Sequence, residues 1–391
     1  MSSVDAASVE LSIVMPCLNE ARTLPACIEK ALRAIQSHGL AAEVIVADNG
    51  SDDGSVEIAE RLGVRVVHVA ERGYGAALSA GIEAARAPFV IMGDADDSYD
   101  FGAIVPFVER LRAGDDLVIG CRFPSGGGTI LPGAMPWKHR WLGNPALSAL
   151  GRRLFHSPVR DFYCGLRGFR RDFVRSLDLR TTGMEFALEM LIKATLRHGR
   201  VSEVPITLAP DGRDRPPHLR SWHDGWRSLR FMMLMSPRWL FLVPGFLLAL
   251  AGAIVCAALL PGPVHFSWIG FDTTTMLVGA MMLLLGFQVI IYAFFSRLFA
   301  VSEGLLPPDP LLNKVFRYVT LETGIIAGST AALGGLLLLI YATVLWGKRG
   351  FGAFDYSQSQ RIVIPAVTAI VLGMQVIFSS FFLSVLGLRR R

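Results

Sequence analysis

The sequence predicts an α/β domain built around a mostly parallel sheet, followed by an α-helical membrane domain. Two observations support this division. Up to about residue 231, charged and apolar residues alternate, whereas long apolar runs dominate the remainder. The hydrophobic fraction of the 391 residues is 52%, which is high for a soluble protein. A composition break of this kind is typical of a soluble domain joined to membrane-spanning helices.

The α/β prediction depends on short apolar strands that alternate with helical segments. Strands are expected at 11–15, 43–47, 64–69, 88–92 and 117–119, and helices at 19–37, 52–62 and 75–85. This order predicts parallel strands with helices on both faces of the sheet. Ligands of such sheets bind beyond the carboxyl ends of the strands. In this chain those ends carry Asn19, Glu20, Asp48, Asp94 and Asp96.

Four apolar stretches in the second half are each long enough to cross about 30 Å of hydrocarbon at about 1.5 Å per residue. They are 239–260, 274–296, 319–346 and 362–387. Before them, residues 220–238 mix Trp, Arg and Met, which favours an amphipathic segment at the membrane surface. The predicted domains are therefore 1–219, 220–238 and 239–391.

The orientation in the membrane follows from the basic residues. The N-terminus carries acidic residues and only a short apolar run, so no signal peptide is expected. Four spans with both termini inside fit the basic residues best, which would place the α/β domain on the cytoplasmic side of the inner membrane. Lys348, Arg349 and Arg361, in the loop after the third span, conflict with this orientation.

The overall charge and the cysteines narrow the class of partner. The formal net charge of +5 suits nucleic acid, an anionic membrane surface or anionic substrates. No zinc-finger, RRM or basic–aromatic pattern is present, so nucleic acid is not expected. The five cysteines form no CxxC pair, which favours free thiols in a reducing compartment. No HxH, HExxH, Ser-His-Asp or Cys-His arrangement is evident.

Asp94 and Asp96 directly follow the apolar strand predicted at 88–92. Two carboxylates at this spacing can share one Mg²⁺ or Mn²⁺ ion, because these ions prefer oxygen ligands and bridge to phosphates. Such an ion would neutralise a diphosphate leaving group. An isolated DxD triplet is usually a solvated acidic turn, but its position after a buried strand favours the metal site.

A second polar cluster, DNGSDDGS at 48–55, follows the strand predicted at 43–47. Asp48 at a strand end is placed to accept hydrogen bonds from a base or a ribose. Ser51 and Asp52 are better explained as turn and helix-cap residues.

Nine motifs occur in order: PCLNE (16–20), DNGSDDGS (48–55), GYGAA (73–77), DAD (94–96), GCR (120–122), RWLGN (140–144), DFYCGLR (161–167), GMEF (183–186) and EVPI (203–206). Together they resemble the motifs of family 2 glycosyltransferases with the GT-A fold, which is Rossmann-like. More narrowly, they are similar to dolichol-phosphate mannose and glucose synthases and their bacterial polyprenyl-phosphate relatives. The resemblance covers about residues 11–230 and is specific as a set, although no single motif is.

The resemblance implies a role for each matching residue on the donor side. Pro16, Glu20 and Asp48 would hold the nucleoside. Asp94 and Asp96 would bind the diphosphate and a Mg²⁺ or Mn²⁺ ion. Gly75 would let the backbone approach the donor, since glycine lacks a Cβ.

On the acceptor side, the resemblance implies that Arg122 and Arg140 grip the lipid phosphate, because arginine forks suit phosphate oxygens. Asn144 would add a polar contact. The loop from 211 to 220 differs from the family pattern, and its arginines are expected to close over the diphosphate or to bind the acceptor phosphate. These are Arg213, Arg215 and Arg220. The expected catalytic residues are Asp96, Arg122 and Arg140.

The expected reaction is inverting transfer of a hexose from a nucleotide-sugar to polyprenyl phosphate. The acceptor phosphate is already anionic, with a second pKa of about 6, so it needs no general base. Glu185 lies roughly where other inverting relatives keep a base, and is interpreted as a binding or structural carboxylate. UDP-glucose is slightly preferred as donor over GDP-mannose, from the likeness of 160–167 to glucosyl-type enzymes. Asp97 and Ser98 replace the family's Leu-Gln, so the third metal ligand is not identified.

Three alternative functions fit the sequence less well. A processive polysaccharide synthase would carry Gln-x-x-Arg-Trp, but the Gln is missing before Arg238 and Trp239. A transporter or flippase with a nucleotide-sugar-binding regulatory domain would need more ionisable residues in its spans. An inactive scaffold is disfavoured by the intact acidic motifs. Glycines 328, 334 and 335 are expected to pack helix on helix, and a homo-oligomer remains open.

Overall fold

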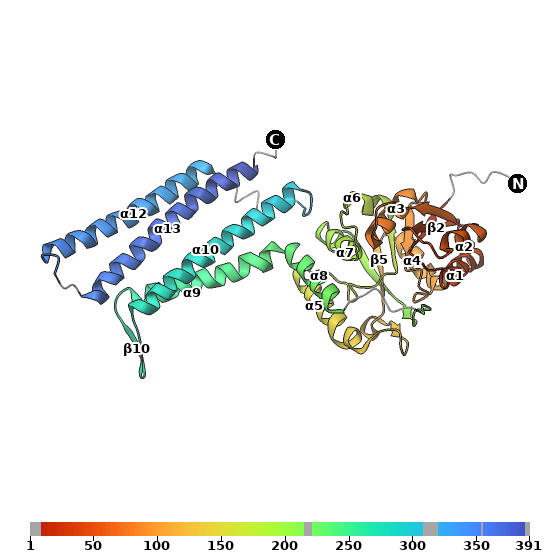
Figure 1. Ribbon diagram of the computed structural model, residues 1–391, viewed down its shortest axis with the longest axis horizontal. Helices are drawn as coiled ribbons and strands as arrows, with labels where there is room; N and C mark the ends of the chain where they lie inside the picture. The colour runs from red at the N-terminus through yellow and green to blue at the C-terminus, as the bar shows by residue number, and fades with distance from the viewer. Residues whose placement is uncertain (1–8, 215–220, 308–319, 353–354, 388–391) are drawn as a thin grey trace. The chain divides into compact units, whose positions relative to one another are not determined.

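The computed structural model describes residues 9–214, 221–307, 320–352 and 355–387. The chain divides into two compact units, Met1–Met232 and Met233–Arg391. Strands and short helices make up the first unit, and long helices dominate the second (Figure 1). The boundary between the units lies beside the change in composition near residue 231.

A seven-stranded sheet forms the centre of unit 1, in the order β3-β2-β1-β4-β7-β5-β8. Its strands are β1 (Leu11–Cys17), β2 (Ala42–Asp48), β3 (Arg65–His68), β4 (Phe89–Met92), β5 (Leu117–Cys121), β7 (Arg167–Arg170) and β8 (Val201–Pro205). β7 runs antiparallel to β4 and β5, and the other neighbours are parallel. All five predicted strands are therefore present, and the sheet is mostly parallel as predicted.

Apolar side chains on both faces of the central strands form the core of unit 1. Ile13, Val14, Ile45 and Ile91 are fully buried. Continuous apolar runs of this kind are typical of parallel strands whose two faces are both covered.

The helices of unit 1 follow the predicted order. They are α1 (Leu24–Ser37), α2 (Ser55–Arg61), α3 (Tyr74–Ala84), α4 (Val105–Arg112), α5 (Asn144–Phe155), α6 (Arg171–Ser176), α7 (Phe186–Leu196) and α8 (Ser221–Leu234), with short turns η1 (Phe101–Ala103), η2 (Pro124–Gly126) and η3 (His139–Gly143). The helix predicted from residue 19 begins only at Leu24. Asn19 adopts a left-handed backbone with φ of 59°, and Pro25 lies in the first turn of α1.

A two-stranded sheet brings residues 207–209 of unit 1 back to the DxD motif. β6 (Thr129–Ile130) pairs with β9 (Thr207–Leu208). The Leu208 backbone also forms a bridge with Tyr99, and the Ala209 amide donates to the Ser98 carbonyl at 3.0 Å. The residues after β9 are thereby held beside residues 96–99.

Among its described residues, unit 2 contains four helices that are long and apolar enough to cross a membrane: Arg238–Leu259, Thr273–Ser302, Leu321–Lys348 and Tyr356–Leu386. They correspond to η4 (Arg238–Leu242) with α9 (Val243–Leu259), α10 (Thr273–Ser302), α12 (Leu321–Lys348) and α13 (Tyr356–Gly387). A hairpin of β10 (Val264–Phe266) and β11 (Ile269–Phe271) joins α9 to α10. The predicted helical membrane domain is confirmed by these four helices.

Glycines allow these helices to approach closely. A Cβ on Gly328 would lie 2.6 Å from the Gly373 carbonyl oxygen, and one on Gly335 would lie 2.5 Å from the Ala366 carbonyl oxygen. The helix-packing interpretation is therefore correct for these two glycines of α12. It is wrong for Gly334, where a Cβ would meet no atom within 4 Å.

Arg361 explains part of the conflict in the predicted orientation. Its guanidinium is bonded to Asp272 and donates from Nε to the Leu259 carbonyl at 3.1 Å, and the side chain is 12% exposed. Arg361 is thus neutralised inside unit 2 and adds little to the positive charge of its loop.

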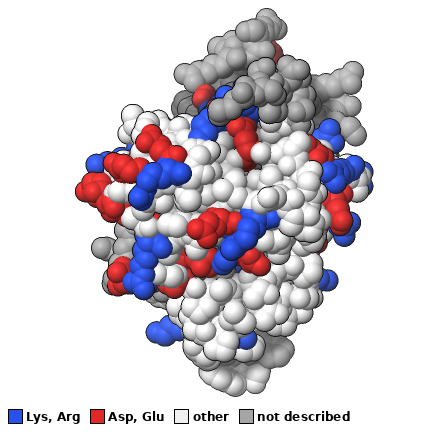
Figure 2. All heavy atoms as spheres, turned by 90° about the vertical axis from the view of Figure 1, so that its right-hand side faces the viewer, with Lys and Arg blue, Asp and Glu red and all other residues white. Residues whose placement is uncertain are grey.

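Elsewhere, on the face seen in Figure 2, Lys and Arg side chains lie among Asp and Glu side chains.

Candidate functional site

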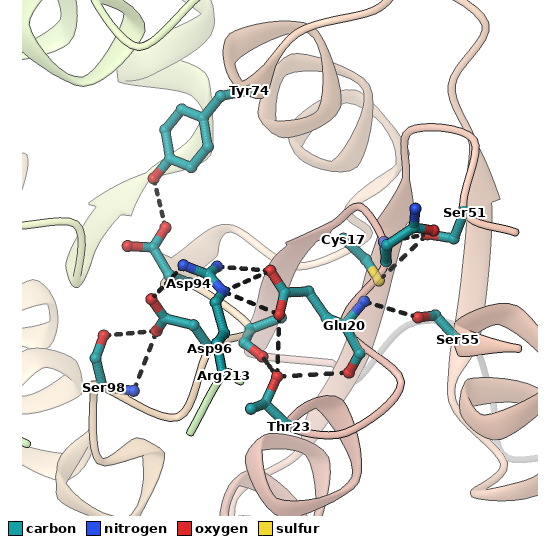
Figure 3. Close-up of polar contacts among 12 residues, drawn as sticks. Cys17, Glu20, Thr23, Ser51, Ser55, Tyr74, Asp94, Asp96, Ser98 and Arg213 are labelled. Atoms are coloured by element: carbon teal, nitrogen blue, oxygen red, sulfur yellow. Dashed lines mark hydrogen bonds and ion pairs between the residues drawn. The ribbon is translucent and has the colours of Figure 1, made fainter. Parts of the chain in front are cut away.

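The carboxyl ends of three neighbouring strands place the predicted donor-side carboxylates at one edge of the sheet. β1 lies between β2 and β4, so Glu20, Asp48 and the Asp94–Asp96 pair all follow adjacent strand ends. Figure 3 shows Glu20, Asp94 and Asp96 grouped around the guanidinium of Arg213. These three carboxylates and one arginine, which we call the carboxylate cluster, form the candidate site.

Asp94 is the carboxylate that burial perturbs most clearly in this cluster. Its Oδ1 accepts a hydrogen bond from the Tyr74 hydroxyl at 2.8 Å. Burial, together with the neighbouring charge of Asp96, raises the pKa of Asp94 to about 6. Burial and the charge of Asp94 also raise the pKa of Tyr74 well above its usual value, so Tyr74 stays protonated and donates.

Asp96 divides its two oxygens between a turn and an arginine. Its Oδ1 accepts from the Ser98 hydroxyl at 2.6 Å and from the Ser98 amide at 3.1 Å. Its Oδ2 lies 3.1 Å from Nη1 of Arg213. Ser98 therefore orients the carboxylate, and Oδ2 faces the centre of the cluster.

Glu20 binds the same arginine in a two-pronged arrangement. Nη2 and Nε of Arg213 donate to Glu20 Oε1 at 2.6 and 2.9 Å, and Nε also lies 3.1 Å from Oε2. The Thr23 hydroxyl bridges the Ala95 carbonyl at 2.7 Å and Glu20 Oε2 at 3.1 Å. Thr23 thus links the start of α1 to the DxD turn, a role that its sequence position did not reveal.

The Asp48 carboxylate is bound largely by backbone amides of the turn that follows it. Its carboxylate accepts from the backbone amides of Gly50 and Ser51, each at 3.1 Å. The Ser51 hydroxyl in turn accepts from the Asn19 amide at 2.9 Å. The turn interpretation of Ser51 therefore extends to Asp48, and its expected contact with a nucleoside stays a prediction. Pro16, in β1, pairs in register with Ala47 beside it.

Residue 75 must be a glycine because any side chain at this position would clash with neighbouring residues of the protein. A Cβ at this position would lie 2.5 Å from the Thr181 carbonyl oxygen and 2.8 Å from the Phe186 Cβ. The Gly75 amide donates to the Thr182 carbonyl at 2.8 Å. The residues before α7 therefore hold the first turn of α3, which carries Tyr74. The predicted approach of the donor to Gly75 stays a prediction.

Arg122 follows β5 and is locked to Asp161. Its Nε and Nη2 donate to the two Asp161 oxygens at 2.7 and 2.8 Å, and its backbone amide donates to the same carboxylate at 3.1 Å. The side chains of Arg122 and Asp161 are 8% and 0% exposed. Most of the fork that was expected to hold the lipid phosphate is thus already engaged. Sequence reasoning quoted Asp161 only as part of a motif and missed this pairing.

Arg140 and Asn144 lie on a separate segment, in η3 and at the start of α5. Arg140 stacks over Trp141, with 5.4 Å between its Cζ and the ring centroid. Asn144 Nδ2 lies 3.7 Å from Met135 Sδ. Both contacts are local, so no contact among the described residues joins Arg140 or Asn144 to the carboxylate cluster. Arg215 and Arg220 lie outside the described residues.

Glu185 is paired with an arginine of α8. Arg227 donates from Nε and Nη2 to the two Glu185 oxygens at 2.6 and 2.7 Å. Both Glu185 oxygens are thus engaged by one arginine fork. The structure therefore supports the interpretation of Glu185 as a structural carboxylate.

The carboxylate oxygens of Asp94 and Asp96 fit a hard divalent cation whose other coordination positions are filled by further ligands. Among the described residues there is no group of three or more His, Cys, Asp or Glu side chains arranged to hold a metal. Asp94 and Asp96 supply two carboxylates, and burial together with the neighbouring charge of Asp96 raises the pKa of Asp94. Mg²⁺ is commonly bound by one or two carboxylates together with water and substrate phosphates.

Comparisons with known proteins cover both units. The chain matches the model of glycosyl transferase family 2 over residues 12–178, and that of the glycosyltransferase family 2 C-terminal transmembrane region over residues 294–387. It is 35% identical over 380 residues to the low-salt glycan biosynthesis hexosyltransferase Agl6 of Haloferax volcanii, covering 96% of this chain and 89% of that protein. It is 32% identical over 197 residues to the dolichyl-phosphate hexose transferase of the same organism, covering 50% of this chain and 82% of that protein.

Solved structures were also compared. Glucosyl-3-phosphoglycerate synthase from Mycobacterium tuberculosis, in complex with Mn²⁺, UDP-glucose and phosphoglyceric acid, matches with a TM-score of 0.46 at 24% identity. That match covers 58% of this chain and 79% of the other.

Proposed function

The chain belongs to glycosyltransferase family 2 and is a membrane glycosyltransferase, and from this premise we propose that it transfers a hexose from a nucleotide-sugar to polyprenyl phosphate. The observation that carries the proposal is the carboxylate cluster at the ends of β1 and β4. It offers paired carboxylates for a metal–diphosphate and lies in a chain with four membrane-spanning helices. A relative named as a dolichyl-phosphate hexose transferase supports the lipid acceptor.

On the donor side, Asp94 and Asp96 would hold a Mg²⁺ or Mn²⁺ ion, which would neutralise the departing diphosphate. Tyr74 and Ser98 orient these two carboxylates by hydrogen bonds. Glu20 and Asp48, together with Pro16, would bind the nucleoside. UDP-glucose is the preferred donor, and GDP-mannose is the alternative.

On the acceptor side, Arg140 and Asn144 would grip the lipid phosphate. Arg122 uses Nε and one terminal nitrogen for Asp161, so only its other terminal nitrogen remains to reach a phosphate. The charge of Arg122 also lowers the pKa of Asp94, which places its charge near the DxD pair. We therefore assign the main contact with the acceptor to Arg140 and a supporting one to Arg122.

The proposed step is an in-line displacement at the anomeric carbon. An oxygen of the acceptor phosphate forms the new bond to that carbon while the bond to the nucleoside diphosphate breaks, so the configuration inverts. The acceptor is already anionic and no proton has to be removed. Catalysis would come from positioning and from stabilisation of charge on the leaving group.

The proposed location is the inner membrane, with unit 1 on the cytoplasmic side. Residues 220–238 would form an amphipathic juxtamembrane segment between the catalytic domain, 1–219, and the membrane domain, 239–391. Trp222 and Trp226 of α8 are 93% and 62% exposed, which supports contact with lipid headgroups.

The first test uses purified full-length protein, Mn²⁺, undecaprenyl phosphate and a panel of radiolabelled nucleotide-sugars. We expect label in a lipid product that depends on both the metal and the lipid phosphate, and the productive donor names the sugar. Asp96→Ala should abolish the transfer. Folded protein that yields no labelled lipid with any donor would overturn the proposal.

A further inference from the structure

Arg213 is a partly buried cation between two carboxylates with different proposed tasks. It contacts Glu20, which we assign to the nucleoside, and Asp96, which we assign to the metal. Its side chain is 17% exposed, and those of Glu20 and Asp96 are 6% and 12% exposed. All three nitrogen atoms of the guanidinium are engaged. A solvated surface arginine would not be enclosed in this way.

The backbone around Arg213 is fixed at the same place. The Gly212 amide donates to the Asp96 carbonyl at 3.0 Å. A Cβ on Gly212 would lie 2.9 Å from Thr23 Cγ2, so the chain passes close to the start of α1. On the other side, Asp214 pairs with Arg22 at 3.1 Å in an exposed ion pair. The loop is therefore built to deliver Arg213 into the cluster.

The geometry predicts that Arg213 and a divalent ion would compete for one oxygen of Asp96. Asp96 Oδ1 is occupied by the Ser98 hydroxyl and amide, which leaves Oδ2 as its inward-facing oxygen. That oxygen is the one bonded to Arg213 Nη1. A metal that uses Asp96 Oδ2 must therefore share this oxygen with the guanidinium or displace it. Two cations on one carboxylate oxygen would also repel each other.

We propose that Arg213 competes with the divalent ion for Asp96 and passes to the donor diphosphate when the metal and the donor bind together. This inference rests on the proposed function and, of the two roles expected for Arg213 from the sequence, selects the contact with the donor diphosphate over the contact with the acceptor phosphate. A diphosphate offers the displaced fork a bidentate anionic partner. The metal then binds weakly by itself and strongly with the nucleotide, and by linkage each ligand raises the affinity of the other.

The test measures Mn²⁺ binding to the full-length protein by electron paramagnetic resonance of the free ion, first without nucleotide. Arg213→Gln should bind Mn²⁺ about tenfold more tightly than the wild type, because the competing guanidinium at Asp96 is gone; a change of this order corresponds to one hydrogen bond between charged groups. Arg22→Gln is the matched control, since it frees the same loop without removing the guanidinium, and should leave Mn²⁺ affinity unchanged. Arg213→Ala provides a second variant with the same expectation.

The second measurement repeats the titration with UDP or GDP present. The nucleotide should raise the Mn²⁺ affinity of the wild type several-fold more than that of Arg213→Gln, since only the wild type can transfer its guanidinium to the diphosphate. Equal or weaker Mn²⁺ binding by both Arg213 variants without nucleotide would overturn the competition and leave the proposed reaction intact. Folded wild type and variants that bind no Mn²⁺ under either condition would overturn both the competition and the proposed metal site.

Discussion

At the scale of single residues, the site stores unfavourable charge that its ligands are expected to relieve. Asp94 and Asp96 lie two residues apart after a buried strand, and Arg213 offsets only part of their charge because it also binds Glu20. The raised pKa of Asp94, about 6, records the cost of ionising this carboxyl in the folded protein. A residue of this kind is expected to lower the stability of the folded protein while it contributes to ligand binding.

Asp94→Asn should therefore stabilise the protein and weaken its binding of Mn²⁺. The Asp94 pKa is higher in the folded than in the unfolded protein, so the folded state binds more protons and wild-type stability falls as pH rises through about 6. The gain in unfolding free energy should be about 1–3 kcal/mol above pH 7. It should shrink as pH is lowered towards 5. Thermal unfolding of both proteins across this range tests the sign, and a variant that is less stable than the wild type at pH 7.5 would contradict it.

The Glu185–Arg227 pair allows a base to be distinguished from a structural carboxylate. As a structural pair, Glu185→Gln, Arg227→Gln and the double variant should all lose similar activity, because each removes the same interaction. A general base would instead lose about 10²–10⁴-fold in Glu185→Gln. Initial rates at saturating donor and acceptor measure the effect on the chemical step. A large loss in Glu185→Gln with normal activity in Arg227→Gln would restore the base interpretation.

At the scale of elements, strand ends were predictable and long-range partners were not. The five parallel strands are apolar runs, and their shared direction alone brings Glu20, Asp48 and the DxD pair to one edge. Arg213 reaches Glu20 across 193 positions of sequence, through the pairing of β9 with β6, and no local pattern encodes that contact. The predicted roles of Arg140 and Asn144 likewise depend on tertiary placement.

β7 lies outside the five predicted strand ranges, and its sequence explains why. Its sequence, RGFR, begins with an arginine that is fully buried. Arg167 satisfies its guanidinium with backbone carbonyls, donating to Cys164 at 2.8 Å and to Phe162 at 2.9 Å. A buried charge is tolerated only when it is fully hydrogen-bonded, and that condition is invisible in a hydrophobicity pattern.

The two adjacent glycines of α12 give a matched pair for testing helix packing. Gly335→Val should destabilise the α12–α13 pair by about 1–3 kcal/mol, because its side chain would meet the Ala366 carbonyl and Ile370. Gly334→Val should leave stability nearly unchanged, since no neighbour lies within 4 Å. Thermal unfolding in detergent compares the two variants. Equal destabilisation would mean that Gly334 also packs against protein.

At the scale of the whole molecule, ion pairs occur in both units. Unit 1 contains many Arg–carboxylate pairs, including Arg112–Glu10, Arg122–Asp161 and Arg213–Glu20. In unit 2, Arg361 and Asp272 form an ion pair among apolar helices. A charge that is paired within a helix bundle costs less to keep out of water than a free one. Arg361 therefore need not lie on the side that positive residues favour, which removes one of the three charges opposing the proposed orientation.

Cysteine labelling in intact cells should settle that orientation. Ser267, in the turn between β10 and β11, and Ser37, at the end of α1, are both exposed. Four of the native cysteines are buried and Cys256 is partly buried, so background labelling should be low. With unit 1 in the cytoplasm, one span separates it from the hairpin. Ser267→Cys should then react with a membrane-impermeant maleimide in intact cells, and Ser37→Cys only after permeabilisation. The opposite pattern would place the catalytic domain outside, where no cytoplasmic nucleotide-sugar could reach the carboxylate cluster.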